Sequence, residues 1–317
     1  MARVYVLHEN PTWFVPLGAA LDRQGVPYEE WFIDTGTIGL DLPPPEGVFF
    51  NRLSGSAHTR GHRLAVEHAR VVLRWLERHG RRVVNRLDAL ELAMSKSALL
   101  SALAAAGIRT PRTVVAVGTE RLVGAAASFS QPFLIKPNRS GKGIGIRYVE
   151  AGSRLDAALA AELATQSIDG IWLLQEYVPP ADGFIDRLEF VGGELLYALR
   201  ADAQSGFNLC PADDCPIPAA GRAGPRFSIR RDFTHPLVGL YRKFLRNHGV
   251  EVAAIEFLTD RHGVAYTYDL NINTNYNAGA EAAAGLSGMQ AIAGFLGAEL
   301  DRLAAPAIPP RRAGAAE

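Results

Sequence analysis

The sequence has only two cysteines, Cys210 and Cys215, among its 317 residues. Two cysteines cannot build a disulfide framework. Without a second cysteine pair or histidines they do not match a structural zinc site either. This scarcity favours a reducing compartment, and we expect a cytoplasmic protein.

The sequence also lacks an excess of charge of either sign. It has 33 Lys and Arg against 33 Asp and Glu, so the formal net charge is zero. Proteins that mainly bind nucleic-acid phosphates carry a clustered basic excess, so we expect no nucleic-acid partner. No apolar run approaches the ~20 residues that a membrane-spanning helix needs. The opening residues lack the apolar stretch and cleavage site of a signal peptide, so we expect no membrane partner.

What is present is an ordinary globular composition with a strand–helix rhythm. Hydrophobic residues make up 48% and charged residues 21%, and the length predicts two or three folding units. Over the first third, apolar runs alternate with amphipathic patterns, which predicts a mostly parallel sheet covered by helices. The predicted strands are 3–8, 28–33, 47–50 and 82–85, and the predicted helices are 13–24 and 61–79.

The remainder of the chain predicts further strands and helices. One Ala- and Leu-rich helix is expected over 88–106, closed by Gly107. Gly192-Gly193 predicts a hairpin within 188–200. The other predicted strands are 113–117, 132–136, 145–148, 171–178, 253–258 and 265–269, with helices at 154–166, 236–247 and 288–303. The predicted domains are 1–87, 88–178 and 179–305, followed by a disordered tail at 306–317.

The most informative segment is a glycine-rich loop between two strands, at 133–145. Gly141, Gly143 and Gly145 would let backbone N–H groups approach phosphate oxygens without side-chain obstruction. Lys136 would supply a fixed positive charge and Lys142 one carried on the loop. The spacing fits neither a P-loop nor a dinucleotide fingerprint. The alternative at this point is a glycine-rich hairpin with incidental lysines.

Polar residues in two later apolar strands predict a metal site. Glu256 lies inside one strand, and Asp269 and Asn271 share one face of the next because alternate strand residues point the same way. Carboxylate and amide oxygens are hard ligands that suit Mg²⁺. The alternative is a set of satisfied edge-strand polar groups. A glutamate in an apolar strand without a cation carries a heavy desolvation cost, which favours the metal site.

Together these motifs, in order from about Val48 to about Asn277, resemble the ATP-grasp superfamily. The closest branch is the RimK-like carboxylate–amine ligases, which include glutathione-synthetase-type enzymes. The resemblance implies an α/β chain with α+β two-layer elements: an ATP-grasp fold preceded by a Rossmann-like domain with a parallel sheet. It also implies ATP and Mg²⁺ as cofactors, with Mn²⁺ as an alternative metal.

The resemblance assigns roles to individual residues. Lys96 in the segment 92–111 and Lys136 resemble the two ATP lysines, and 174–178 resembles the adenine hinge. The catalytic candidates are Arg187 and Lys142, and the metal candidates are Glu256, Asp269 and Asn271. The ATP-binding candidates are Lys96, Lys136, Ser140, Gly141, Gly143, Gln175, Glu176, Tyr177, Val178 and Asn208.

Substrate contacts are assigned from position as well as resemblance. Arg52 follows a predicted strand end and could hold a substrate carboxylate, and a surface or inter-domain salt bridge is the second, slightly less favoured alternative. The full set of substrate candidates is Arg52, Ser54, Arg200 and Asn273.

The sequence departs from the family pattern at several positions. Ser95 stands where the family often has an aspartate, and the two metal carboxylates are exchanged in length. The aspartate that holds the ribose aligns with Ile185, leaving Asp182 or Asp186 as stand-ins.

The predicted function is therefore an ATP-dependent carboxylate–amine ligase acting on an amino acid or small peptide through an acylphosphate. A small-molecule kinase on the same fold and a non-catalytic nucleotide-binding scaffold are the alternatives. The presence of three lysines and three metal ligands argues against the scaffold. The expected partners are small-molecule carboxylates and amines, and a homo-oligomer is left open.

Overall fold

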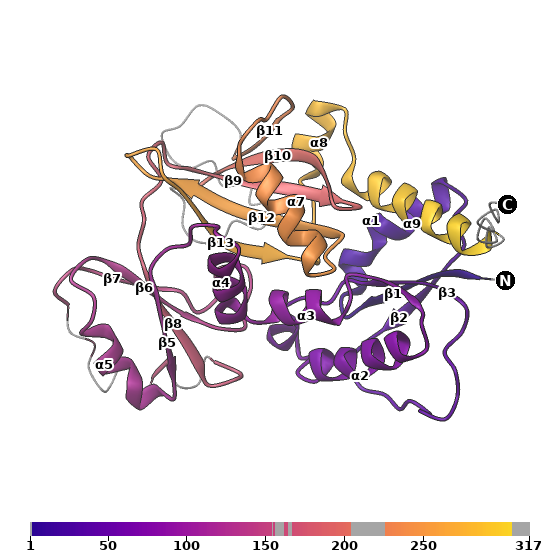
Figure 1. Ribbon diagram of the computed structural model, residues 1–317, viewed down its shortest axis with the longest axis horizontal. Helices are drawn as coiled ribbons and strands as arrows, with labels where there is room; N and C mark the ends of the chain where they lie inside the picture. Colours follow the sequence, from indigo (N-terminus) through magenta and orange to yellow (C-terminus); the bar gives the residue numbers. More distant parts are fainter. Residues whose placement is uncertain (1, 154, 156–161, 164–166, 204–225, 306–317) are drawn as a thin grey trace, which may run out of the picture.

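The computed structural model describes residues 2–153, 155, 162–163, 167–203 and 226–305 and contains three sheets (Figure 1). The first is entirely parallel, with the strand order β2-β1-β3-β4. Its strands are β1 (Arg3–His8), β2 (Tyr28–Phe32), β3 (Gly47–Asn51) and β4 (Arg82–Val84). This confirms the parallel sheet predicted for the first third of the chain.

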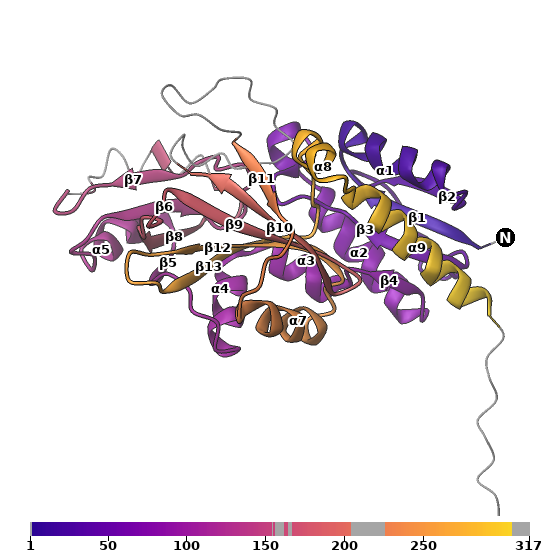
Figure 2. The ribbon, with the colours of Figure 1, turned by 90° about the horizontal axis from the view of Figure 1, so that it is seen from above.

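Alternating side chains divide the first sheet between two apolar layers. Tyr5 and Leu7 of β1 pack with helix α2 (Ala65–Arg78), whereas Val4 and Val6 pack with α1 (Pro11–Arg23). Helix α9 (Gly288–Ala304), from the end of the described chain, lies beside α1 on the same face (Figure 1 and Figure 2). The C-terminal helix therefore completes the core of the N-terminal unit.

The second sheet is antiparallel and carries the glycine-rich loop. Its order is β5-β8-β6-β7, and the loop 138–146 connects its last two strands. A short 3-10 turn (Thr119–Arg121) and helix α5 (Leu122–Ala126) follow its first strand. The strands are β5 (Thr113–Val117), β6 (Phe133–Pro137), β7 (Arg147–Val149) and β8 (Ile171–Glu176).

The third sheet is also antiparallel, with the order β11-β10-β9-β12-β13. Gly192 and Gly193, with φ of 63° and 79°, form the predicted hairpin turn, because both positions need the left-handed backbone that glycine adopts without strain. Helix α7 (Leu237–Asn247) packs on this sheet, and α8 (Ala278–Ala284) follows it. The strands are β9 (Phe184–Val191), β10 (Glu194–Asp202), β11 (Phe227–Arg230), β12 (Val252–Thr259) and β13 (Ala265–Asn271).

The predicted single helix at 88–106 is wrong, because the chain forms two helices there. Helix α3 (Leu87–Met94) ends and α4 (Lys96–Ala105) begins at Ser95, whose backbone is extended at φ −134° and ψ 104°. The Ser95 hydroxyl accepts a hydrogen bond from the Ala98 N–H at 3.3 Å. This is an N-cap, which the alanine- and leucine-rich pattern concealed.

The predicted strands 3–8 and 113–117 have the predicted limits, the limits of the other described elements differ from the prediction by at most four residues, and β11, α5 and α8 had no prediction. The predicted helix at 154–166 lies largely, and the predicted tail at 306–317 wholly, outside the described residues. Within the described part of the chain, no helix has the length and apolar character needed to cross a bilayer.

Candidate active site

A cavity of about 640 Å³ opens where the three sheets meet, and most of the predicted site residues line it. The second sheet and the glycine-rich loop form one wall, β12 and β13 another, and the turn after β3 the end. The predicted residues on its surface are Ser54, Lys96, Lys136, Ser140, Gly141, Lys142, Gly143, Gln175, Glu176, Tyr177, Val178, Arg187, Glu256, Asp269, Asn271 and Asn273.

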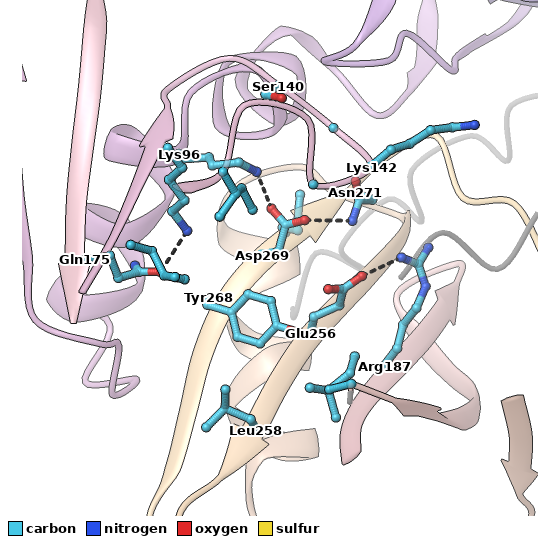
Figure 3. A pocket seen from close by; sticks show the side chains of 18 of the residues that line it. Lys96, Ser140, Lys142, Gln175, Arg187, Glu256, Leu258, Tyr268, Asp269 and Asn271 are labelled. Atoms are coloured by element: carbon cyan, nitrogen blue, oxygen red, sulfur yellow. Dashed lines mark hydrogen bonds and ion pairs between the residues drawn. The ribbon is translucent and has the colours of Figure 1, made fainter. Parts of the chain in front are cut away.

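Three charged residues form a row across neighbouring strands of the third sheet. Arg187 of β9 is the register partner of Glu256 on β12, and Glu256 in turn faces Asp269 on β13. Side chains opposite one another on adjacent strands share a face, so all three point into the cavity (Figure 3). The strand pairing thus creates a charged edge from residues that lie up to 82 positions apart (269 − 187).

Asp269 is the most heavily contacted carboxylate of this row. Its Oδ1 accepts a hydrogen bond from the Lys96 ammonium at 2.8 Å, and its Oδ2 accepts one from the Asn271 amide at 3.2 Å. Burial alone would raise the pKa of Asp269, but Lys96 and then Lys136 hold that pKa below its ordinary value. The carboxylate is therefore ionised in the folded protein at neutral pH.

Arg187 bridges two buried carboxylates. Its Nε donates to Glu189 at 2.6 Å and its Nη1 donates to Glu256 at 2.7 Å. Burial raises the pKa of Glu256 against the opposing effect of Arg187. Burial likewise raises the pKa of Glu189 to about 7, again opposed by Arg187. One guanidinium therefore serves two buried carboxylates, and a cation or a further donor at this edge would favour the ionised form of both.

Lys136 lies deeper than Lys96 and is 5% exposed. Its ammonium donates a hydrogen bond to Gln175 Oε1 at 2.7 Å, from β6 to β8. Burial first, and then the nearby positive charge of Lys96, lower the pKa of Lys136 to about 7 against the opposing effect of Asp269. The Lys136 ammonium is paired with an amide oxygen and not with a carboxylate, so an anionic ligand that bound there would favour its charged form.

Asn138 joins the start of the glycine-rich loop to helix α4. Its carbonyl accepts the Lys96 N–H at 3.2 Å, and its Oδ1 accepts the Ser97 N–H at 2.9 Å. Its amide donates to Asp169 at 2.8 Å. These bonds set the position of Lys96 relative to the loop, a role that sequence reasoning missed because the partners lie about 30 to 40 residues away.

The glycine-rich loop closes against the N-terminal unit. The Lys142 ammonium lies 5.0 Å from the centroid of the Trp13 ring, which also lines the cavity. A Cβ added to Gly141 would lie only 3.2 Å from the Ser56 Cβ, so a side chain at Gly141 would press on Ser56. Neither Trp13 nor Ser56 carries a sequence signal for this contact, since both belong to segments that precede the loop by about a hundred residues.

The hinge segment follows β8. The Glu176 carboxylate accepts the Arg112 N–H at 2.9 Å, and the Tyr177 N–H donates to the Pro132 carbonyl at 2.9 Å. Ile185 and Leu258 supply apolar surface to the cavity nearby, and Asp182 also lines it. This end therefore combines a fixed backbone edge with apolar walls, as a flat aromatic ligand requires.

Some predicted residues do not reach the cavity. Arg52 is 1% exposed and lies behind the wall, where it donates to the carbonyls of Trp13 and Thr274, both at 3.1 Å. Arg200 forms an ion pair with Asp182, while Asp186 pairs with Arg230. Of the two stand-ins for a ribose contact, only Asp182 is on the cavity surface.

Asn208 lies outside the described residues, as do Cys210 and Cys215. Among the described residues no three His, Cys, Asp or Glu side chains gather as metal ligands. The candidate metal set is accordingly two carboxylates and one amide.

The fold matches those of several solved structures. A RimK-domain ATP-grasp protein from Sphaerobacter thermophilus matches with a TM-score of 0.64 and 19% identity, over 93% of this chain and 99% of that one. The chain has the ATP-grasp fold. D-cycloserine synthetase DcsG, an ATP-grasp match at 16% identity, covers 94% of this chain and 99% of its own, with a TM-score of 0.60.

The ATP-grasp ligase PsnB, solved with a minimal precursor, also matches over 94% of this chain and 99% of its own, with a TM-score of 0.66 and 16% identity. No protein-family model matches the sequence, and no curated protein matches it in a sequence search. At 15–19% identity, the solved structures show a shared fold.

Proposed function

We propose that this protein is an ATP-dependent carboxylate–amine ligase that forms an amide bond through an acylphosphate and releases ADP and phosphate. The observation that carries the proposal is the convergence of Lys96, Lys136 and Arg187 on the Glu256–Asp269 edge in one cavity. Phosphoryl transfer depends mainly on alignment and charge neutralisation, and this arrangement supplies both.

The donor set fits a hard divalent cation. Glu256, Asp269 and Asn271 present oxygen atoms on one face of two paired strands, and Mg²⁺ is bound by one or two carboxylates together with substrate phosphates. When bound, Mg²⁺ would neutralise charge on the transferring phosphate. PsnB has been solved with Mg and ADP, which supports the same pair for this chain.

The chain's own residues divide the remaining work. The hinge at Glu176–Val178 and the apolar side chains beside it would bind the adenine. Lys136 would exchange its hydrogen bond to Gln175 for one to a phosphate oxygen. Lys96 would donate both to Asp269 and to a phosphate oxygen. Backbone N–H groups from Gly141 to Gly143 would cover the terminal phosphate.

Arg187 has a different part, because it is tied to Glu189 and Glu256 on both sides. It would hold the Glu256 carboxylate ionised and aimed at the metal while adding positive charge near the reacting phosphate. The substrate carboxylate then attacks the γ-phosphorus and ADP leaves. The amine next attacks the acyl carbon, loses a proton, and phosphate leaves with the former carboxylate oxygen.

For the substrate we propose an amino acid or a small peptide. PsnB binds a precursor peptide, and DcsG is a D-cycloserine synthetase, so matching folds serve both small and peptide substrates. The test is a panel of amino acids and short peptides, with phosphate release followed in the presence and absence of an amine and product mass read afterwards. Phosphate release that needs no amine, or a phosphorylated product, would contradict the ligase proposal.

A further inference from the structure

The turn after β3 places two serines at the end of the cavity. Ser54 and Ser56 both line it and are 9% and 2% exposed. Ser56 lies against the glycine-rich loop at Gly141, and the Ser140 carbonyl lies 3.4 Å from where a Cβ on Gly55 would be. The serine pair therefore adjoins the segment proposed to cover the terminal phosphate.

The hydrogens of this serine pair can be counted. The two hydroxyl oxygens are 2.9 Å apart, so one O–H is used between them. Ser56 Oγ also accepts from the Arg60 guanidinium at 2.9 Å, and Ser54 Oγ accepts from the Ser56 N–H at 3.2 Å. Arginine and backbone N–H groups only donate. One O–H hydrogen is therefore left over, and whichever serine carries it lines the cavity.

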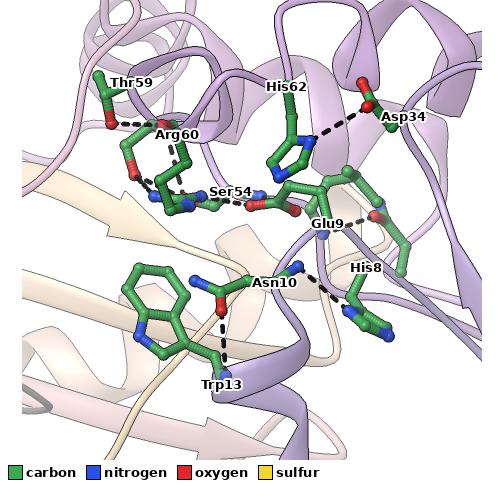
Figure 4. A network of polar contacts seen from close by, with 12 residues as sticks. His8, Glu9, Asn10, Trp13, Asp34, Ser54, Thr59, Arg60 and His62 are labelled. Carbon is green, nitrogen blue, oxygen red and sulfur yellow. Dashed lines mark hydrogen bonds and ion pairs between the residues drawn. The ribbon is translucent and has the colours of Figure 1, made fainter.

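An ion pair between the buried Glu9 and the partly exposed Arg60 holds this arrangement from behind (Figure 4). Arg60 Nη2 donates to Glu9 Oε1 at 2.5 Å, and Glu9 Oε2 accepts the Ser54 N–H at 3.3 Å. Glu9 is fully buried and is not on the cavity surface. The Glu9 carboxylate is paired with Arg60, and the serine hydroxyls, not this carboxylate, line the cavity.

The charges around the serine pair favour an anionic partner. The carboxylates on the cavity surface, among the described residues, are Glu176, Asp182, Glu256 and Asp269, which lie toward the hinge and the metal strands. Near the serine pair, the Arg60 guanidinium that donates to Ser56 lies 4.8 Å from the centroid of the Trp13 ring, and the Lys142 ammonium lies 5.0 Å from that ring. The O–H that is left over donates to an acceptor oxygen, and Lys142 adds a positive charge on the same part of the cavity surface, so the serine pair suits an anionic oxygen.

We infer that Ser54 and Ser56 act as one shared hydrogen-bond donor to the carboxylate of the substrate, held in place by Arg60 and Glu9. This rests on the proposed ligase function for the identity of the reacting group. In this inference the serine pair binds the substrate carboxylate, and Arg52 has a structural role through its bonds to the Trp13 and Thr274 carbonyls. Arg60 and Glu9 are positioning residues, since neither Glu9 nor Arg60 is on the cavity surface.

The shared donor makes a specific prediction about variants. In Ser54→Ala the Ser56 O–H no longer has a serine partner and turns to the ligand; in Ser56→Ala the Ser54 O–H does the same. Each single variant therefore keeps one donor, and its KM for the carboxylate should rise no more than about threefold. The double variant has none, and its KM should rise about tenfold or more, beyond the product of the single effects.

The assay uses hydroxylamine as the amine, so that only the carboxylate varies. Hydroxamate and ADP are measured with the standard amino acids and simple dipeptides as carboxylates. Carboxylate binding is measured separately, as a thermal shift in the presence of Mg-ADP. Thr59→Val is the matched control, because Thr59 donates to the Ser56 carbonyl at 2.7 Å but does not line the cavity.

The expected result is a carboxylate-specific, synergistic loss with Mg-ADP affinity changed less than twofold. Additive single effects, an equal loss in Thr59→Val, or a parallel loss of Mg-ADP or ATP affinity would overturn the inference, the last assigning the donor to phosphate. A wild-type protein that binds no carboxylate would overturn it as well. A wild type that binds a carboxylate but forms no hydroxamate contradicts the ligase proposal alone.

Discussion

Two parts of the cavity differ in how buried charge is arranged: the candidate metal edge, formed by Arg187, Glu256 and Asp269, and the serine turn, formed by Ser54 and Ser56. At the metal edge, Arg187, Glu256 and Asp269 face the cavity directly, and their charges are only partly balanced by one another. At the serine turn, Glu9 and Arg60 balance one another behind the surface and present only neutral hydroxyls. Charge is exposed to the cavity where phosphates and a cation are proposed to bind.

The difference has a physical basis in what each ligand brings. An Mg-nucleotide carries several strong charges, and preorganised charges of opposite sign lower the free energy of placing it in a partly buried site. A carboxylate that must react has to remain nucleophilic, and a neutral donor positions it without the strong pairing that a guanidinium would impose. The following variants test this contrast, in order of decreasing expected effect.

Removing charge from the metal edge should have the largest effect. Asp269→Asn should lower ligase turnover more than about 100-fold, since even residues that only support metal ligands contribute 10- to 100-fold. Folding should be affected less, because Asn keeps the shape of the side chain. ADP formation and Mg²⁺ titration measure the effect, with Asp301→Asn on the exposed side of α9 as control. Undiminished Mg²⁺ dependence would contradict the metal assignment.

Removing the bridge between the buried carboxylates should mainly cost stability. Arg187→Met leaves Glu189 and Glu256 without their shared partner, and we expect a loss of about 3–5 kcal/mol in the free energy of unfolding. The control is Arg230→Met, whose partly exposed pair with Asp186 should contribute less than about 1 kcal/mol. Chemical denaturation distinguishes them, and equal losses would show that burial is not the deciding factor.

Arg52 should behave as a structural residue. Arg52→Met leaves the carbonyls of Trp13 and Thr274 without their donor, which should cost about 2–3 kcal/mol of stability. The KM for the carboxylate should change much less than in the double serine variant. Arg3→Met, which breaks an exposed pair with Glu29, is the control. A large KM effect at unchanged stability would restore Arg52 as the carboxylate contact.

The smallest expected effect is the uptake of a proton by Lys136 when nucleotide binds. Its pKa is about 7 in the folded protein against an ordinary 10.5, so nucleotide phosphates that raise it should draw in up to about one proton at pH 8. Calorimetry of Mg-ADP binding in buffers with different ionisation enthalpies measures this uptake. Lys136→Met should abolish it, and an unchanged uptake in that variant would assign the proton elsewhere.

The same shift fixes the sign of a stability effect. Between about pH 7 and 10.5 the unfolded chain holds a proton on Lys136 that the folded chain has lost. The free energy of unfolding of the nucleotide-free protein should therefore rise with pH across this window through the contribution of Lys136. Lys136→Met should flatten that rise.

Much of the fold follows from local pattern. The parallel first sheet and the Gly192-Gly193 hairpin were predictable because strand alternation and glycine turns act over a few residues. The break at Ser95 was not, since one serine cap competes with a long run of good helix formers. The candidate metal residues could be picked out by type, because a glutamate and an aspartate inside apolar strands carry a desolvation cost that calls for a partner.

What only the tertiary structure decided was which polar residue faces which partner. The sequence by itself determined that Asp269 and Asn271 share a face, since strand periodicity points alternate residues the same way, whereas the register of β12 and β13 set Glu256 opposite Asp269. It could not decide between Arg52 and the serine turn. Arg52 is buried behind the cavity wall and donates to the Thr274 carbonyl, 222 residues away. Ser56 is oriented by Arg60, which is paired with Glu9. Such hydrogen bonds depend on the packing of distant elements, which no local pattern encodes.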